Sequence, residues 1–356
     1  MAYWSFRGID TMAWSRDYAQ GQQVKSRVPL LCRRLASLHV SHLTYDGPYD
    51  DPATYGAPPG WMNWWLQSIR DTGSRVWFRM GWATWQGWFG KPVLTYSTSP
   101  AVPYESPGRV WWVVNGQDKI SYLAKTYQWI LQNPSAFRDG DIFSPISEPQ
   151  NGYIAPYFPA GASPQFPSLI AFNNFITDIT VVCRLAFQTI GKKVTVGFYG
   201  CQGRPGDADQ LYLSTIRDIG PRAVSADLYY ATPADMVLHL RVLHDYYRAP
   251  IILGEWGDIW DSTPDQAVQR VNTIYSAVSR LPFVPGVSYF EGVSHRGPVP
   301  ASNDGLVDPN TLQILPHGQA VGQWFARQTP PWERPVVWAG LATAVGGLWY
   351  IHRRRS

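Results

Sequence analysis

The chain has 356 residues, of which 45% are hydrophobic and 16% are charged, and its formal net charge is +4. This composition is typical of a well-filled globular core and excludes a disordered chain. The mild charge, with no Lys/Arg-rich run before the extreme C-terminus, argues against a nucleic-acid partner.

Short β-like runs alternate with helical segments along the chain. The runs predicted as strands are 6–14, 39–46, 75–82, 141–149, 193–200, 223–230, 250–257 and 286–292. One helix is predicted from Phe172 to Ile190, where apolar residues recur every three or four positions before Gly191. Two more are predicted around Pro233 and Pro264, because proline is favoured in the first turn of a helix. This alternation predicts an α/β fold, either a closed parallel barrel or a doubly wound sheet.

A (β/α)8 TIM barrel is the better interpretation because acidic residues gather at the predicted strand ends. These residues are Asp10, Asp46, Glu148, Asp227, Glu255 and Glu291. In such a barrel the carboxyl ends of the strands converge on one mouth, where catalytic residues lie. Two long loops, 83–116 and 149–169, follow the third and fourth strands and are expected to shape a substrate cleft there.

The pattern of histidines, cysteines and glycines predicts no metal and no cofactor. The three cysteines form no CxxC pair, and the histidines form no HExxH motif. A nucleotide-binding sheet would need a glycine-rich turn after its first strand, and the run from Phe6 to Thr11 has none. An enzyme of nucleotides or nucleic acids is therefore the weakest of the functional hypotheses.

Tryptophan is abundant, with 18 residues, and it is clustered. The clusters are Trp61, Trp64 and Trp65; Trp77, Trp82, Trp85 and Trp88; and Trp111 and Trp112. Flat rings near loops suit a ligand with broad apolar faces, such as a sugar ring. Core and loop packing is the alternative explanation for part of this set.

Two glutamates follow buried strand-like runs. Glu148 ends the fourth predicted strand and precedes Pro149, and Glu255 ends the near-continuous apolar run of the seventh. A buried carboxylate is costly unless it is paired or used. Facing each other across one mouth, two carboxyls can divide the roles of general acid and nucleophile, as the cleavage of a glycosidic bond requires.

The motifs around these glutamates resemble those of the retaining (β/α)8-barrel glycoside hydrolases, a clan that includes the family 5 cellulases and mannanases. That clan has its acid/base glutamate at the end of strand four, usually in Asn-Glu-Pro. Its nucleophile ends strand seven, often in Gly-Glu-aromatic-Gly. This chain has Ser147-Glu148-Pro149 and Gly254-Glu255-Trp256-Gly257 there. The resemblance covers residues 6–327 and implies that Glu148 is the acid/base and Glu255 the nucleophile.

The resemblance implies further site residues. A strand-six tyrosine commonly hydrogen-bonds the nucleophile in the clan, and Tyr229 is preferred to Tyr230 because it shares a strand face with Asp227. The clan's arginine comes from strand two; here Arg79 on strand three takes its place if it points inward, and a salt bridge elsewhere is the alternative. The other substrate-binding candidates are Ser147, Trp82, Trp85, Trp256, Asp10, Asp227 and Glu291.

Two positions depart from the clan's pattern. Ser147 replaces the asparagine that usually contacts the sugar 2-hydroxyl, and it reaches less far. The strand-eight tryptophan is replaced by the run Tyr289-Phe290-Glu291.

These observations lead to two main hypotheses. The first is a retaining glycosidase that cleaves a β-linked oligo- or polysaccharide, with a carboxyl separation of about 5–5.5 Å between Glu148 and Glu255. The second is a non-catalytic glycan-binding barrel displayed at a membrane.

The C-terminal segment predicts a membrane anchor. The barrel is expected to occupy 1–328, a linker 329–335, a transmembrane helix 336–352 and a basic tail 353–356. The run from Val336 to Ile351 is uncharged, has aromatic residues near its ends and precedes three arginines, although it is slightly shorter than the roughly 17–25 residues that span a bilayer. A terminal core helix is the alternative. Cytoplasmic arginines would place the barrel outside the cytoplasm, yet MAYWSFRGID contains no signal-peptide pattern.

Overall fold

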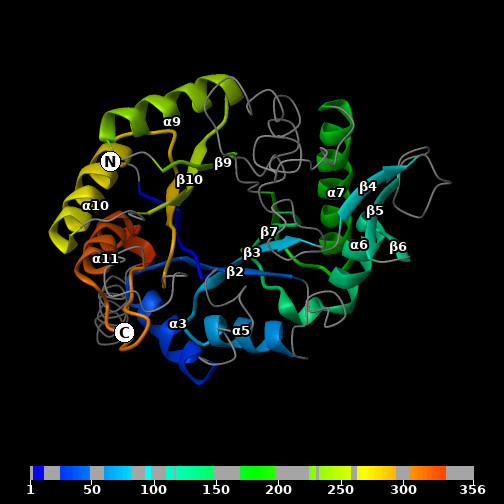
Figure 1. Ribbon diagram of the computed structural model, residues 1–356, viewed down its shortest axis with the longest axis horizontal. Helices are drawn as coiled ribbons and strands as arrows, with labels where there is room; N and C mark the ends of the chain where they lie inside the picture. Colours follow the sequence, from blue (N-terminus) through cyan, green and yellow to red (C-terminus); the bar gives the residue numbers. More distant parts are fainter. Residues whose placement is uncertain are drawn as a thin grey trace, which may run out of the picture.

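A computed structural model describes residues 3–11, 25–48, 60–81, 93–97, 110–115, 118–146, 169–197, 224–229, 232–257, 263–293 and 305–333. Eight of its strands form one parallel, curled sheet surrounded by helices (Figure 1). The strands are β1 (Phe6–Ile9), β2 (His42–Pro48), β3 (Arg75–Gly81), β7 (Ile142–Ser144), β8 (Thr195–Val196), β9 (Val224–Asp227), β10 (Ile251–Trp256) and β11 (Gly286–Tyr289).

The order of the strands is that of a TIM barrel. Along the sheet the order is β8-β7-β3-β2-β1-β11-β10-β9, so chain neighbours pair, except β8 and β9 at the two ends of this order, and the last strand pairs with the first. Seven of the eight lie within a range predicted from the sequence, and β2 overlaps its range but extends to Pro48. The predicted parallel, TIM-barrel-like α/β fold is therefore confirmed.

Helices lie around the outside of this sheet (Figure 1). They are α3 (Val28–Ala36), α5 (Trp61–Arg70), α6 (Tyr122–Gln132), α7 (Leu169–Thr189), α9 (Pro233–Tyr247), α10 (Pro264–Val278) and α11 (Pro316–Gln328). Short 3-10 turns form η1 (Lys25–Arg27), η2 (Pro134–Ala136) and η5 (Pro331–Glu333).

The helix ends follow the signals in the sequence. Thr263 and Gln266 form a capping box at the start of α10, with Pro264 in the first turn. Thr232 caps α9 by accepting a hydrogen bond from the backbone N–H of Asp235. Beyond the end of α7, Gly191 has φ of 67°, a conformation that glycine adopts without strain.

A second, small sheet interrupts the segment that the sequence analysis treated as one long loop, 83–116. In it β4 (Val93–Ser97), β5 (Val110–Asn115) and β6 (Asp118–Ser121) pair antiparallel in that order. That prediction was wrong here because runs rich in aromatic and β-branched residues, VLTYS and VWWVVN, can pair with each other without joining the barrel. The sheet lies beside α6 at the periphery (Figure 1).

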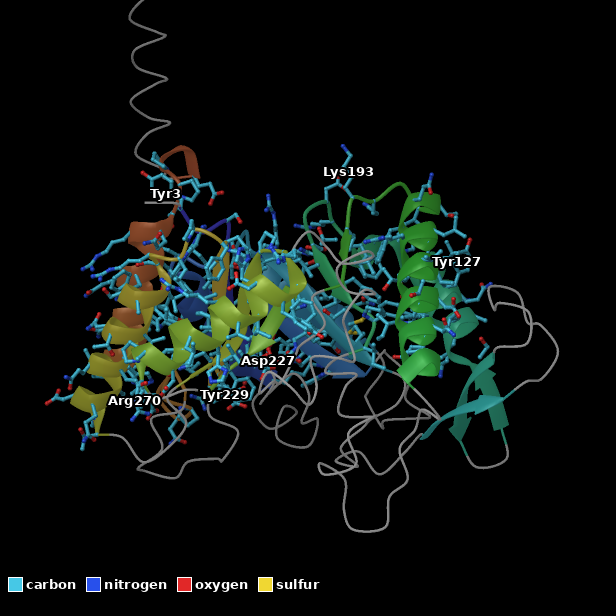
Figure 2. The ribbon with its side chains drawn as sticks, turned by 90° about the horizontal axis from the view of Figure 1, so that it is seen from above. Tyr3, Tyr127, Lys193, Asp227, Tyr229 and Arg270 are labelled. Atoms are coloured by element: carbon cyan, nitrogen blue, oxygen red, sulfur yellow. The ribbon has the colours of Figure 1, made fainter. Side chains whose placement is uncertain are left out.

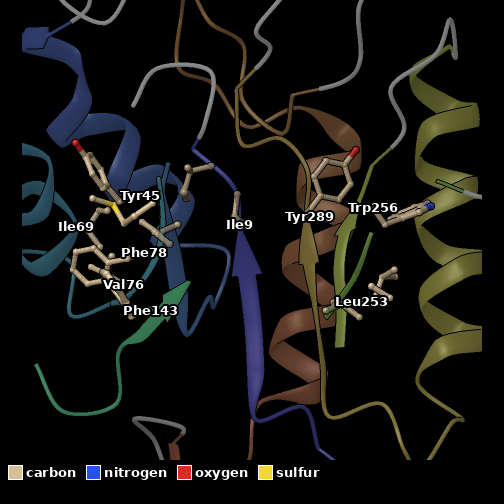
Figure 3. Packing of buried hydrophobic residues seen from close by; sticks show 14 of the residues in the cluster. Ile9, Tyr45, Ile69, Val76, Phe78, Phe143, Leu253, Trp256 and Tyr289 are labelled. Atoms are coloured by element: carbon tan, nitrogen blue, oxygen red, sulfur yellow. The ribbon is translucent and has the colours of Figure 1, made fainter. Parts of the chain in front are cut away.

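Residues on the barrel strands alternate between the helices and the interior, as strand geometry requires. Ile9, Val76 and Leu253 belong to the main core between the sheet and the helices (Figure 3). The inward positions carry a separate apolar layer, formed by Phe6, Trp77, Ile142 and Ile252.

Hydrogen bonds, as well as apolar contacts, hold the residues of the interior layer together. The indole N–H of Trp77 donates to Ser144 Oγ at 2.9 Å, and that hydroxyl donates to the carbonyl oxygen of Gly197 at 2.5 Å. The Trp77 indole and the Ser144 hydroxyl are thus satisfied, and this layer forms the floor beneath the barrel mouth.

Several tryptophans that were considered for ligand binding are structural instead. Trp61 and Trp65 on α5, and Trp77 on β3, are at most 1% exposed. Trp65 packs edge-on against both Trp61 and Trp64 of the same helix. Trp61 and Trp65 belong to the main core between the helices and the sheet. The predictions for Trp82, Trp85 and Trp88 fall outside the described residues.

The described chain ends at the strand amino ends of the barrel. Glu333 forms an ion pair of 2.8 Å with Arg7, and the backbone N–H of Trp4 donates to the carbonyl of Gln328. Within the described ranges, no helix combines the length and apolar character needed to cross a membrane. The segment 336–352 lies outside those ranges.

Candidate active site

Charged and polar side chains meet inside the barrel at the carboxyl ends of the strands. Figure 2 shows Asp227 and Tyr229 toward one end of the molecule, while Tyr3 and Lys193 lie toward the opposite end. The buried members of this group are Asp10, Asp46, Arg79, Asp227 and Glu255. Of the acidic strand ends predicted from the sequence, Asp10, Asp46 and Glu255 thus converge on Arg79, and Asp227 lies near it.

Arg79 lies at the centre of this group. It follows Trp77 by two positions on β3, so both side chains point inward, and its guanidinium carbon lies 5.3 Å from the centre of the Trp77 ring. Its Nη1 donates to Asp10 Oδ2 at 2.8 Å, and its Nε lies 3.3 Å from Asp46 Oδ1. Its Nη2 contacts Glu255 Oε1. One guanidinium therefore joins carboxyls from three other strand ends.

Glu255 reaches the mouth because β10 is irregular at Gly254. Leu253 and Trp256 both face the helices, and the pairing register of β10 with both neighbouring strands shifts between them. In a regular strand Glu255 would face the same way as Leu253, but the bulge turns it inward. Glycine allows this, since a Cβ at position 254 would lie 2.0 Å from Ser225 Oγ.

Tyr229 holds the second oxygen of Glu255. It follows Asp227 by two positions beyond β9, and its hydroxyl donates to Glu255 Oε2 at 2.5 Å. Phe290 packs edge-on against the Tyr229 ring, with the ring centroids 5.8 Å apart. The two carboxylate oxygens thus have different partners, a cation on one and a phenol on the other, and these partners fix the plane of the carboxylate.

Asp46 is held by a short chain of hydrogen bonds that involves Thr44 of β2 and Thr11, which follows β1. Thr44 donates its hydroxyl hydrogen to Asp46 Oδ2 at 2.7 Å. The Thr44 hydroxyl in turn accepts from the backbone N–H of Thr11 at 3.0 Å, and Thr11 Oγ1 donates to the carbonyl of Thr44 at 2.7 Å.

Burial dominates the ionisation of this site. It raises the pKa of Asp46, and the Glu255 carboxylate adds to that rise, although Arg79 and the Thr44 hydroxyl act in the opposite direction. Burial alone would lower the pKa of Arg79, but the surrounding carboxyls raise it well above its ordinary value. These carboxyls are Asp46, Glu255, Asp10 and Asp227.

The structure places most of the predicted site residues that it describes at the barrel mouth. Asp10, Arg79, Asp227 and Tyr229 lie there together with Glu255, and Glu291 is buried directly after β11. Ser147, Glu148, Trp82 and Trp85 lie outside the described residues.

Trp256 requires a correction. It was expected to contact substrate, but it is 1% exposed and packs against Tyr275 of α10 and Tyr289 of β11. The bulge that turns Glu255 inward leaves the next side chain on the helix side.

Sequence reasoning did not assign Asp46 and Thr44 to the site. The sequence contained a signal for both residues: they occupy alternate positions at the end of one predicted strand, so they share a strand face. Among the described residues, no group of three or more histidine, cysteine, aspartate or glutamate side chains is arranged to hold a metal ion.

The fold of this barrel is similar to those of solved glycoside hydrolases. A GH5_18 protein from Streptomyces cattleya in complex with GlcNAc has a TM-score of 0.67 at 13% identity, covering 92% of this chain and 82% of its own. A GH5-4 broad specificity endoglucanase from Clostridium acetobutylicum has a TM-score of 0.61 at 13% identity, covering 90% and 96%. A fungal β-1,4-galactanase has a TM-score of 0.58 at 12% identity, covering 90% and 99%.

These similarities concern the fold, since the identities are low. The parallel barrel is shared with the three proteins over most of each chain. No protein-family model and no curated protein matches the sequence.

Proposed function

We propose that the protein is a retaining glycoside hydrolase that cleaves a β-linked oligo- or polysaccharide, with Glu255 as nucleophile and Glu148 as acid/base. One observation carries the proposal: Glu255, at the carboxyl end of a barrel strand, contacts Arg79 through one oxygen and Tyr229 through the other. A carboxylate held on both oxygens at a barrel mouth is oriented for attack on one carbon. The GH5 barrels that share the fold support the same class of reaction.

The mechanism follows from the two carboxyl groups. Glu148 protonates the glycosidic oxygen as it leaves, while Glu255 attacks the anomeric carbon and forms a covalent glycosyl-enzyme. Glu148 then removes a proton from water, which displaces Glu255 and restores the original anomeric configuration. Tyr229 and Arg79 hold Glu255 in place before attack and receive it after release. The other mouth residues, Asp10, Asp227 and Glu291, are proposed to contact the sugar hydroxyls, as are Ser147, Trp82 and Trp85.

A panel of polysaccharides and aryl β-glycosides tests the activity, with Glu255→Gln as the decisive variant. We expect it to fold normally and to lose turnover, whereas Glu333→Gln, the same change at the opposite end of the barrel, should retain it. Normal hydrolysis by Glu255→Gln would overturn the assignment of the nucleophile. Nuclear magnetic resonance of the first product formed gives the stereochemistry, and an inverted anomer would overturn the retaining mechanism.

A non-catalytic glycan-binding barrel is the second candidate. Trp82, Trp85 and Trp88, together with the serine at position 147 where the clan has asparagine, favour it. Isothermal titration that detects oligosaccharide binding, without any product from the same sugar, would support this candidate over hydrolysis.

We also propose that residues 336–352 anchor the barrel in a membrane, with 329–335 as linker, 353–356 as cytoplasmic tail and the barrel outside the cytoplasm. The uncharged run with its basic end supports this topology. The Arg7–Glu333 ion pair, at the amino ends of the barrel strands, supports an anchor that begins at that end of the barrel. Protease accessibility of the barrel in intact cells tests the arrangement, since a protected barrel would contradict it.

A further inference from the structure

Arg79 is surrounded by more acidic groups than one cation can balance. Asp10, Asp46 and Glu255 all contact its guanidinium, and none of these side chains is more than 7% exposed. Asp227 lies close enough to act on the same guanidinium. Several like charges in a buried space of this size cannot all be ionised, because each added charge is opposed by its neighbours and by lost hydration.

The donors around each carboxyl show where one proton resides. Glu255 contacts the guanidinium through one oxygen and accepts from the Tyr229 hydroxyl through the other, so it is the best stabilised of the three as an anion. Asp10 and Asp46 lie at the ends of neighbouring strands and contact the same guanidinium, and two buried carboxyls beside one cation oppose each other's ionisation.

We propose that Asp10 and Asp46 share one proton at neutral pH and together act as a positioning pair for Arg79. The pair then carries a single negative charge, which leaves the guanidinium free to hold Glu255 with its Nη2 group. Loss of the shared proton would add a second anion beside Nε and Nη1 and would draw Arg79 away from Glu255.

The groups that face the pair from the other strand ends set the pH range of this effect. In the described part of the chain, Arg79 is the cation, and Asp227, Tyr229 and Glu255 are the other titratable groups shown beside it at the mouth. The neighbouring carboxylates oppose ionisation of the pair, and Arg79 favours it. The catalytic consequence rests on the proposed function, but the shared proton does not.

The charge of the folded protein tests the proton directly. Capillary electrophoresis at pH 7 would compare the wild type with Asp46→Asn, Asp10→Asn, the double variant and Asp308→Asn. Asp308 is the matched control, because the backbone N–H of Thr311 holds the pKa of this surface carboxyl below its usual value and keeps it ionised.

A shared proton predicts no change in charge for either single variant, because the remaining carboxyl keeps one negative charge. The double variant and Asp308→Asn should each become more positive by one unit. A single variant that gains a full unit would overturn the proposal, as would a double variant that gains none. Infrared spectra of the wild type provide a check without mutation: absence of a protonated-carboxyl band at pH 7 would also overturn it.

The pH profile tests the positioning role. Turnover of the wild type should fall as the pH rises on the alkaline side of the pH profile. The Asp46→Asn variant should shift this alkaline limb of the profile to higher pH. The change should appear mainly in kcat, because Glu255 acts after the substrate has bound. An unmoved alkaline limb would overturn the positioning role. If no sugar is cleaved by the wild type, the function proposed above fails while the electrophoretic result still decides the shared proton.

Discussion

The hydroxyl of Tyr229 lies 2.5 Å from Oε2 of Glu255 and joins the ends of two neighbouring strands, β9 and β10. Hydrogen bonds to a charged group contribute about 1.5–3 kcal/mol, roughly twice the value of a neutral pair. The Tyr229→Phe variant should therefore lower kcat/KM by about 10- to 100-fold while the melting temperature changes little. The matched control is Tyr246→Phe on α9, which is exposed and far from the mouth. Equal kcat/KM in wild type and Tyr229→Phe would show that this hydrogen bond does not serve the reaction.

Arg79→Lys should be far more damaging than its conserved charge implies. Three different nitrogens of Arg79 contact Asp10, Asp46 and Glu255, and a single ammonium cannot reproduce that fork. We expect turnover to fall by more than about 100-fold and the free energy of unfolding to fall by about 3–5 kcal/mol, as for other broken buried ion pairs. Urea denaturation measures the fall in the free energy of unfolding. Arg241→Lys on the exposed side of α9 is the control. An Arg79→Lys variant as stable as the wild type would mean that one ammonium can replace the three guanidinium contacts without loss of free energy of unfolding.

Gly254→Ala should disturb the bulge that directs Glu255. The new Cβ would lie 2.0 Å from Ser225 Oγ and 2.7 Å from Asp227 Oδ1, both buried. Overpacking of this kind costs about 1–3 kcal/mol, so both the melting temperature and turnover should fall. Adding Ser225→Ala removes the nearer clash and should restore part of the stability. If the double variant is no better than Gly254→Ala alone, the strain lies in the backbone and not in this contact.

Protonation of His42 should destabilise the fold at acidic pH. Burial, with smaller effects from Arg75, Arg7 and Arg70, lowers the pKa of His42 from 6.5 to about 3, although the hydrogen bond with the Gly140 carbonyl opposes the shift. The unfolded chain therefore binds a proton that the folded chain does not. The contribution of His42 to stability is complete above pH 6.5 and is lost as pH falls from 6.5 toward 3, by about 1.4 kcal/mol per pH unit.

The difference between wild type and His42→Gln isolates this effect from the carboxyl groups. Urea midpoints measured from pH 7 to pH 4 should converge as pH falls, because glutamine does not titrate. Parallel curves would show that His42 is protonated in the fold or accessible to solvent.

The sequence predicted the barrel well because strand alternation is a local property. Eight apolar runs, each followed by a helix, required no knowledge of distant contacts, and counting by two placed Tyr229 on the same side as Asp227. The same counting fails on β10, where Leu253 faces the helices and the bulge at Gly254 turns Glu255 inward. Such a bulge depends on the close approach of Ser225 from the neighbouring strand, which no local pattern reveals. The assignment of Trp256 to the substrate failed for the same reason.

Long-range pairing explains what else was missed. The hairpin of β4 and β5 was treated as loop because its runs pair with each other and not with the barrel. Asp46 was noted as an acidic strand end, but only the fold brings it to Arg79 and Asp10.

The apolar layer of Phe6, Trp77, Ile142 and Ile252 closes the interior of the barrel below its mouth. Nothing can pass through its axis, because these four side chains fill the interior directly below Arg79. Under the proposed function, a long glycan would therefore lie across the rim and could not thread through, and product would leave by the opening at which substrate enters. The opposite end, where Arg7 meets Glu333, can be attached to another structure without obstructing that opening.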